Sequence, residues 1–169
     1  MAQTGSEVSG SISIDEPRPE DVDRIGTLFE EDMADLGVET DSDDLRELAR
    51  SVTEGMAQDP AECLCWVARR PSDDQVVGLV LANFNWSVKF GGRSLWIETL
   101  YVTPDARRRG LGRALVEQLL DWAEQHDIRG IDLEAYRGNT PASILYRTLG
   151  FHRLGRERFY YRLEGSEYL

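Results

Sequence analysis

A run rich in glycine and arginine lies between a stretch with strand periodicity and a stretch with helix periodicity. It reads Arg107-Arg108-Arg109-Gly110-Leu111-Gly112-Arg113. The first amides of a helix have no backbone partner and lie at the positive end of the helix dipole. A bound anion therefore accepts hydrogen bonds from these amides and is also attracted by the dipole. Glycine permits a positive φ and a close approach of the backbone, and arginine adds charge. The run therefore predicts a strand–turn–helix unit whose turn holds a pyrophosphate group.

Two familiar phosphate-binding loops do not fit this run. No Gly-Lys-Ser/Thr is present, which excludes the loop of nucleotide hydrolases. The dinucleotide fingerprint needs a third glycine where this chain has Leu115, and its fold needs several successive βαβ units. What remains is a loop for another pyrophosphate ligand, or an ordinary glycine-containing loop with solvated arginines.

The rest of the chain switches between the two periodicities. Helices are expected over residues 21–37, 42–56, 110–127 and 141–149. Strands are expected over residues 11–15, 63–69, 76–84, 94–102, 128–135 and 158–163, with a turn at 71–74 and a connecting loop at 85–93. One strand–helix–strand unit inside an antiparallel order predicts an α/β (α+β) domain. Its sheet is expected to be mixed and mostly antiparallel, with helices on both faces.

Length and charge narrow the class of protein. The 169 residues favour one domain over residues 11–169, after a small polar segment, residues 1–10, that is expected to be disordered. No run approaches the roughly 20 apolar residues of a membrane helix, and a signal-peptide core is missing, so we expect a cytoplasmic protein. A net charge of −12 disfavours nucleic acid as a partner and suits a cationic substrate, although an acidic surface also serves solubility.

The cysteines and histidines do not form a metal-binding pattern. Cys63 and Cys65 lie far in sequence from His126 and His152, so no metal is expected. One residue apart on a predicted strand, the two cysteines point the same way but are poorly placed to form a disulfide. We interpret both as structural.

Motifs on both sides of the loop match one known family in order and spacing. Arg107, Gly110 and Gly112 form Arg-x-x-Gly-x-Gly, a strand over 95–104 precedes them, and Asn139 follows with Ala142-x-x-x-Tyr146-x-x-x-Gly150-Phe151. Together they resemble the Gcn5-related N-acetyltransferase (GNAT) superfamily. Within it, the strand is most similar to that of diamine (spermidine/spermine) N-acetyltransferases, with Thr99 in place of an acid. Aminoglycoside acetyltransferases have a similar strand.

The resemblance implies a single GNAT-like domain that uses acetyl-CoA as cosubstrate and transfers the acetyl group directly in a ternary complex. A splayed strand would offer backbone groups to the pantetheine, and the loop would hold the pyrophosphate. Asn139 either contacts the cofactor or caps the following helix. The implied cofactor-binding residues are Leu100, Tyr101, Val102, Arg107, Arg108, Arg109, Gly110, Leu111, Gly112, Arg113, Asn139, Ala142 and Tyr146.

Transfer to an alkylamine needs a group that accepts the amine proton. With a pKa near 10.4, such an amine costs about 4–5 kcal/mol to deprotonate at pH 7. Glu98 is the candidate base, because strict alternation places it on one strand face with Leu100 and Val102, opposite to Ile97, Thr99 and Tyr101. A structural ion pair or an acid exposed at the sheet edge would explain Glu98 equally well.

Tyr146 is the candidate acid for the leaving thiolate. It shares a helix face with Ala142 and Gly150, and the resemblance places this phenol beside the coenzyme sulfur. A core tyrosine is the alternative interpretation.

The acceptor is the least constrained part of the prediction. Asp32 and Asp35 on the first helix, together with Glu98, are candidate substrate contacts, although a solvated helix face explains the two aspartates as well. The leading hypothesis is an N-acetyltransferase for a small, polyamine-like cation. A protein or peptide amine, an aminoglycoside, or a non-catalytic acetyl-CoA-binding regulator are the alternatives. The aromatic residues 159–161 either form a homodimer interface or pack on the last strand.

Overall fold

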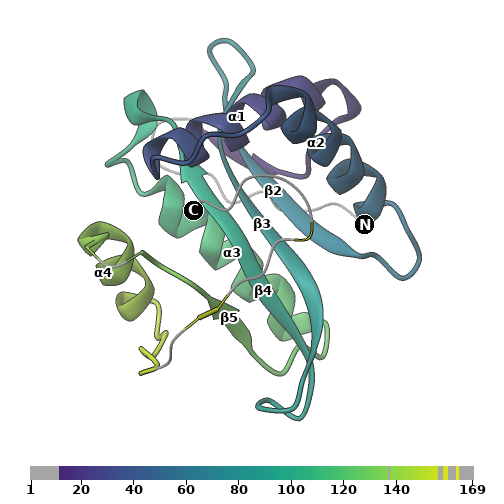
Figure 1. Cartoon of the computed structure of the whole chain (residues 1–169), viewed down its shortest axis with the longest axis vertical. Helices are drawn as coiled ribbons and strands as arrows, with labels where there is room; N and C mark the ends of the chain where they lie inside the picture. Colours follow the sequence, from purple (N-terminus) through teal and green to yellow (C-terminus); the bar gives the residue numbers. More distant parts are fainter. Residues whose placement is uncertain (1–11, 137, 156–157, 160–162, 164–169) are drawn as a thin grey trace.

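The computed structural model describes residues 12–136, 138–155, 158, 159 and 163 (Figure 1). Five strands form one sheet in the order β1-β2-β3-β4-β5, antiparallel throughout except for the parallel pair β4 and β5. The strands are β1 Ser13–Asp15, β2 Cys63–Arg70, β3 Gln75–Ser87, β4 Gly92–Val102 and β5 Ile131–Leu133. The helices are α1 Val22–Asp35, α2 Ser42–Met56, α3 Leu111–Gln125 and α4 Thr140–Thr148.

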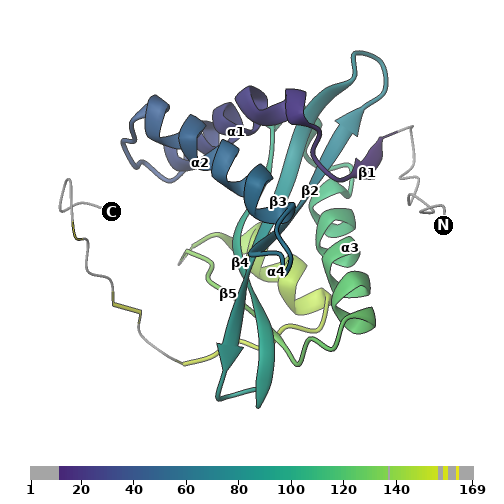
Figure 2. The same cartoon turned by 90° about the vertical axis from the view of Figure 1, so that its right-hand side faces the viewer.

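Helices cover both faces of the sheet, as predicted. α1 and α2 pack on one face and α3 on the other (Figure 2). Side chains of β2 alternate between the two cores: Leu64, Trp66 and Ala68 join α3, whereas Cys63, Cys65 and Val67 join α1 and α2. We call these the α3-side core and the α1/α2-side core. Both cysteines are free and buried, and burial raises the pKa of each thiol, so they stay protonated and inert.

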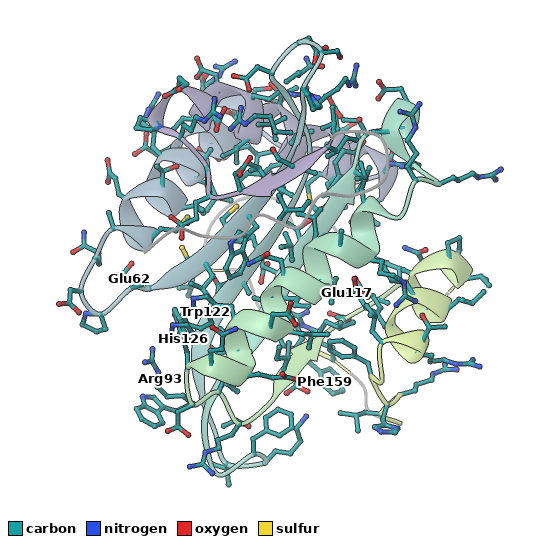
Figure 3. All side chains as sticks on the ribbon, turned by 180° about the vertical axis from the view of Figure 1, so that it is seen from behind. Glu62, Arg93, Glu117, Trp122, His126 and Phe159 are labelled. Carbon is teal, nitrogen blue, oxygen red and sulfur yellow. The ribbon has the colours of Figure 1, made fainter. Side chains whose placement is uncertain are left out.

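The end of α3 is anchored by an aromatic cluster. The Trp122 ring lies 6.3 Å from the Trp66 ring and 5.8 Å from the Phe84 ring, and His126 stacks on it at 3.9 Å. Figure 3 shows Trp122 and His126 together at the end of this helix. His126 therefore has a packing role.

Buried charge holds the start of α1 to the sheet. The Arg69 guanidinium binds both carboxylate oxygens of Asp21, at 3.1 and 2.6 Å, and both side chains are about 95% buried. Burial alone would raise the pKa of Asp21. Hydrogen bonds from Arg69 and from the Arg18 amide lower it more, so the carboxylate stays charged.

The predicted loop over 85–93 is wrong. β3 continues to Ser87 and β4 begins at Gly92, so the two strands form a long hairpin that extends past the helices (Figure 1). The apolar alternation fades there because large side chains near the tip face solvent: Trp86 and Val88 are 83% and 101% exposed. The predicted strand over 128–135 shrinks to three residues, since β5 pairs with β4 only over that length.

The predictions for the two chain ends fall mostly on residues outside the described part. This holds for residues 1–10, Tyr160 and Tyr161, and for half of the predicted strand over 158–163. Phe159 is described, and it is exposed (Figure 3). A homodimer through these rings stays a prediction.

Candidate functional site

A bulge in β4 lies at the centre of the site. Leu81 of β3 faces Thr99, and the next residue, Ala82, faces Ile97, so Glu98 is an extra residue with no partner on β3. Such a bulge reverses the alternation of side chains along the strand.

Because of this bulge, the predicted grouping of β4 side chains is wrong for Ile97, whereas the groupings of Thr99 with Tyr101 and of Leu100 with Val102 are confirmed. Ile97 lies in the α3-side core together with Leu100 and Val102, whereas Tyr101 is buried in the α1/α2-side core. Thr99 also turns toward α1, where its hydroxyl donates a hydrogen bond to Asp32. Glu98 itself is exposed and forms no ion pair with a described residue.

β4 parts from β5 just before the bulge. The parallel pairing covers only Leu95–Ile97 against Ile131–Leu133, so Leu100–Val102 have no described strand partner on that side. An unpaired strand edge offers backbone donors and acceptors to an extended ligand. This is the open edge that the predicted pantetheine contacts require.

The loop after β4 has the backbone geometry of an anion site. Arg108 and Gly110 adopt left-handed conformations with φ of 62° and 77°, and no side chain caps the first turn of α3, which begins at the buried Leu111. Gly112 packs within reach of Leu145 and Leu100, so the start of α3 lies against both α4 and β4. Uncapped amides at a helix start, preceded by two left-handed residues, fit a diphosphate.

The arginines of the loop divide into two groups. Arg107 donates from Nε to the Val102 carbonyl at 2.8 Å and from Nη2 to Asp35 at 2.6 Å, while Arg113 binds Thr148 at 2.6 Å. These two side chains tie the loop to α1 and α4. Arg108 and Arg109 are exposed and have charges free to approach a phosphate.

Asn139 and Ala142 lie at the start of α4. The Asn139 side chain accepts a hydrogen bond from the Ala142 amide at 3.2 Å, which is the helix-capping geometry. Of the two interpretations of Asn139, the structure shows the cap.

Tyr146 lies on α4, against the α3-side core, with its ring edge-to-face to Phe151 at 5.7 Å. Burial, and then the charge of Asp32, raise the pKa of Tyr146 to about 12. The phenol is therefore protonated at neutral pH and is a hydrogen-bond or proton donor.

Asp32 and Asp35, predicted as a pair, have different surroundings. Asp35 is engaged with Arg107. Asp32 is partly buried beside the bulge, where burial raises its pKa although the Thr99 hydrogen bond opposes this. Asp32, Thr99 and Tyr146 thus gather from three elements at the point where β4 and β5 separate. Thr99 was not predicted as a site residue from the sequence. Its position could have indicated this role, because Thr99 follows Glu98 at the place where the diamine acetyltransferases carry an acid.

An open hollow of about 390 Å³ lies between α1 and the end of β4. It is lined by Arg24, Glu31, Ala34, Asp35, Tyr101, Thr103, Pro104 and Asp105. Burial, followed by the charges of Asp35 and Glu31, raises the pKa of Tyr101 to about 12. Acidic side chains thus outnumber basic ones in the lining of this hollow.

The described residues contain neither a metal-binding cluster nor a membrane-spanning helix. Nowhere among them do three histidine, cysteine or acidic side chains gather as a metal site would require. None of the helices in this part of the chain is long and apolar enough to cross a bilayer.

Known proteins match this chain in sequence and in structure. It is 41% identical over 73 residues to the N-alpha-acetyltransferase RimI of Mycobacterium tuberculosis, which covers 42% of this chain and 43% of the relative. It is 43% identical over 60 residues to a ribosomal protein bS18 alanine N-acetyltransferase of Escherichia coli, covering 36% and 40%. The chain thus spans less than half the length of these curated relatives. Neither relative is a diamine acetyltransferase, so the predicted subgroup is not supported.

A solved structure shares the fold over nearly the whole chain. It is a predicted acetyltransferase from Clostridium acetobutylicum, crystallised with acetyl-CoA, with a TM-score of 0.72 at 19% identity, covering 89% of this chain and 96% of that one. The sequence profile of the acetyltransferase (GNAT) family matches residues 24–151, which contain the bulge, the loop, α3 and α4. The chain belongs to the acetyltransferase (GNAT) family.

Proposed function

We propose that this protein is an acetyl-CoA-dependent N-acetyltransferase whose acceptor is the α-amino group of a protein or peptide. One observation carries the transferase assignment: an uncapped helix start, an open strand edge and a partly buried tyrosine follow one another from the α3 loop to the β4 bulge. Membership of the acetyltransferase family and the solved neighbour with acetyl-CoA support the same ligand.

Separate parts of the chain would hold the two ends of acetyl-CoA. The α3 amides and the side chains of Arg108 and Arg109 would bind the pyrophosphate, and the backbone of Leu100–Val102 would bind the pantetheine. When bound, the cosubstrate supplies an acetyl thioester. The Tyr146 hydroxyl, protonated up to about pH 12, would donate a proton to the departing sulfur.

The assignment of the acceptor rests on the relatives and on proton affinity. The two curated relatives are an N-alpha-acetyltransferase and a ribosomal-protein alanine N-acetyltransferase. An α-amino group has a pKa of about 7.7–8.0, so its deprotonation at pH 7 costs about 1–1.4 kcal/mol, against about 4–5 kcal/mol for a polyamine. A site in which the half-buried carboxylate of Asp32 lies near the phenol suits the easier substrate. We therefore replace the polyamine hypothesis with a peptide acceptor.

The test is thiol release from acetyl-CoA with matched acceptors. A lysine-free peptide with a free α-amine is compared with the same peptide blocked at its N-terminus, with spermidine and with an aminoglycoside. We expect release only with the free peptide amine, and its loss in Tyr146→Phe. Release with spermidine but not with any peptide from an N-terminal library would contradict the peptide assignment. No binding of acetyl-CoA in calorimetry would contradict the transferase assignment.

A further inference from the structure

We propose that Asp32 of α1, oriented by Thr99 beside the β4 bulge, binds the acceptor amine and takes up its proton, and that Glu98 does not. This inference rests on the proposed function, because it assigns a role within the same site.

The bulge determines which β4 side chain faces α1. Strict alternation would place Thr99 on the same side as Ile97, in the α3-side core. The extra residue Glu98 reverses this, so the Thr99 hydroxyl reaches α1 and donates to Oδ2 of Asp32. The other oxygen, Oδ1, accepts no hydrogen bond from a described side chain or amide, and it is the atom available to an ammonium group.

The groups around Asp32 come from three elements. Asp35 lies one turn further on the same helix, Arg107 lies on the phosphate loop, and Tyr146 lies on α4. Asp35 and Arg107 neutralise each other in an ion pair, which leaves Asp32 as the unpaired negative charge nearest to the phenol. A base and an acid are thus placed on opposite sides of the open end of β4.

Burial distinguishes Asp32 from Glu98. Glu98 is exposed, where water weakens the attraction between two charges. Asp32 is half-buried, where the same attraction is stronger, and burial raises its pKa toward that of an α-amine. Proton transfer becomes more favourable as the two pKa values approach each other.

The protons balance with these two residues. An acceptor ammonium loses two protons on becoming an amide: the first passes to Asp32 Oδ1 and then to water. As the C–N bond forms and the C–S bond breaks, Tyr146 gives its proton to sulfur, and the second proton from the nitrogen restores the phenol. The net products are the N-acetyl peptide, the free thiol and one proton.

The experiment compares Asp32→Asn with Glu98→Gln, using Asp23→Asn as a control for a charge lost elsewhere on α1. We expect kcat/KM for the peptide to fall by about 100-fold or more in Asp32→Asn, by less than about ten-fold in Glu98→Gln, and not to change in Asp23→Asn. Thr99→Val, which keeps the shape but removes the donor, is expected to lie between the first two.

A second measurement does not depend on turnover. The peptide is titrated into the protein saturated with coenzyme A, in two buffers of different ionisation enthalpy, which counts the protons released on binding. Wild type and Glu98→Gln are expected to bind the ammonium form without release, whereas Asp32→Asn is expected to bind more weakly and to release a proton. Unchanged coenzyme A affinity and an intact unfolding transition show that the variant is folded.

The outcomes separate this inference from the proposed function. If wild type acetylates the peptide and Asp32→Asn retains its kcat/KM and proton count, the role of Asp32 is refuted and the proposed function stands. A collapse in Glu98→Gln with an active Asp32→Asn would assign the base to Glu98 instead. If wild type acetylates no amine, the proposed function itself fails.

Discussion

Replacing Gly110 by alanine tests the loop geometry quantitatively. Gly110 has a φ of 77°, and a Cβ atom built on it meets nothing within 4 Å, so the only cost of alanine is the left-handed conformation. That conformation costs an L-residue about 1–2 kcal/mol. Gly91, in the β3–β4 turn, has a φ of 71° and an equally open surrounding. Gly91→Ala is therefore a matched control with the same strain far from the loop.

The cost must appear in one of two measurements. If the introduced alanine keeps the positive φ of Gly110, the strain lowers the free energy of unfolding by about 1–2 kcal/mol and the midpoint of thermal unfolding by about 2–8 °C. If the loop relaxes to a negative φ at position 110, the free energy of unfolding returns to that of wild type. The loop amides must then be brought back to the left-handed arrangement when acetyl-CoA binds. Affinity then falls by up to about 5–30-fold.

Calorimetry of acetyl-CoA binding and thermal unfolding measure both effects. We expect the two losses in Gly110→Ala to sum to about 1–2 kcal/mol, whereas Gly91→Ala loses stability alone. A Gly110→Ala variant with the stability and affinity of wild type would refute the role of the left-handed loop. Weaker acetyl-CoA binding in Gly91→Ala would refute the placement of the acetyl-CoA site at the α3 loop.

Three further substitutions have defined outcomes. Tyr146→Phe is expected to lower kcat by about 10²–10⁴-fold with acetyl-CoA affinity kept, because the protonated phenol donates the proton to the departing sulfur. A retained kcat in steady-state kinetics would contradict this. Asp21→Asn leaves the buried Arg69 charge uncompensated and is expected to cost about 3–5 kcal/mol in urea unfolding at pH 7. Because the pKa of Asp21 is lowered, this difference should vanish as pH falls below 3.8, and a constant difference would argue against it. Asp32→Asn is expected to raise the midpoint of thermal unfolding at pH 7, because the raised pKa of Asp32 means that folding disfavours its charged form. This gain in stability should fade as the pH falls toward 3.8. A loss of stability at pH 7 would contradict the prediction.

The sequence predicted the architecture because its signals are local. Periodicity located the four α-helices of the described residues and the antiparallel core strands, and the glycines of the loop predicted the strand–turn–helix unit that the structure shows. The single parallel pair, β4 with β5, followed from the one strand–helix–strand connection.

The details of the site depend on contacts between distant elements, which no local pattern records. The bulge at Glu98 has no composition signature, so alternation wrongly placed Ile97 on the same face as Thr99 and Tyr101. Arg107 belongs to the phosphate-loop motif, yet its side chain turns to α1 because Asp35, 72 residues away, lies there. The predicted hairpin is shorter than the observed one because side chains such as Trp86 and Val88 face solvent near the tip, where the apolar alternation is lost.

The position of the transferred acetyl group tests the central claim most directly. A peptide with a free α-amine and one internal lysine is incubated with the protein and acetyl-CoA, and fragmentation mass spectrometry locates the modification. The proposed function predicts a single acetyl group on the N-terminal nitrogen, formed by wild type and not by Tyr146→Phe. Acetylation of the lysine alone would contradict the acceptor assignment, and an unmodified peptide despite bound acetyl-CoA, across a library of N-termini, would contradict the assignment as an N-terminal acetyltransferase.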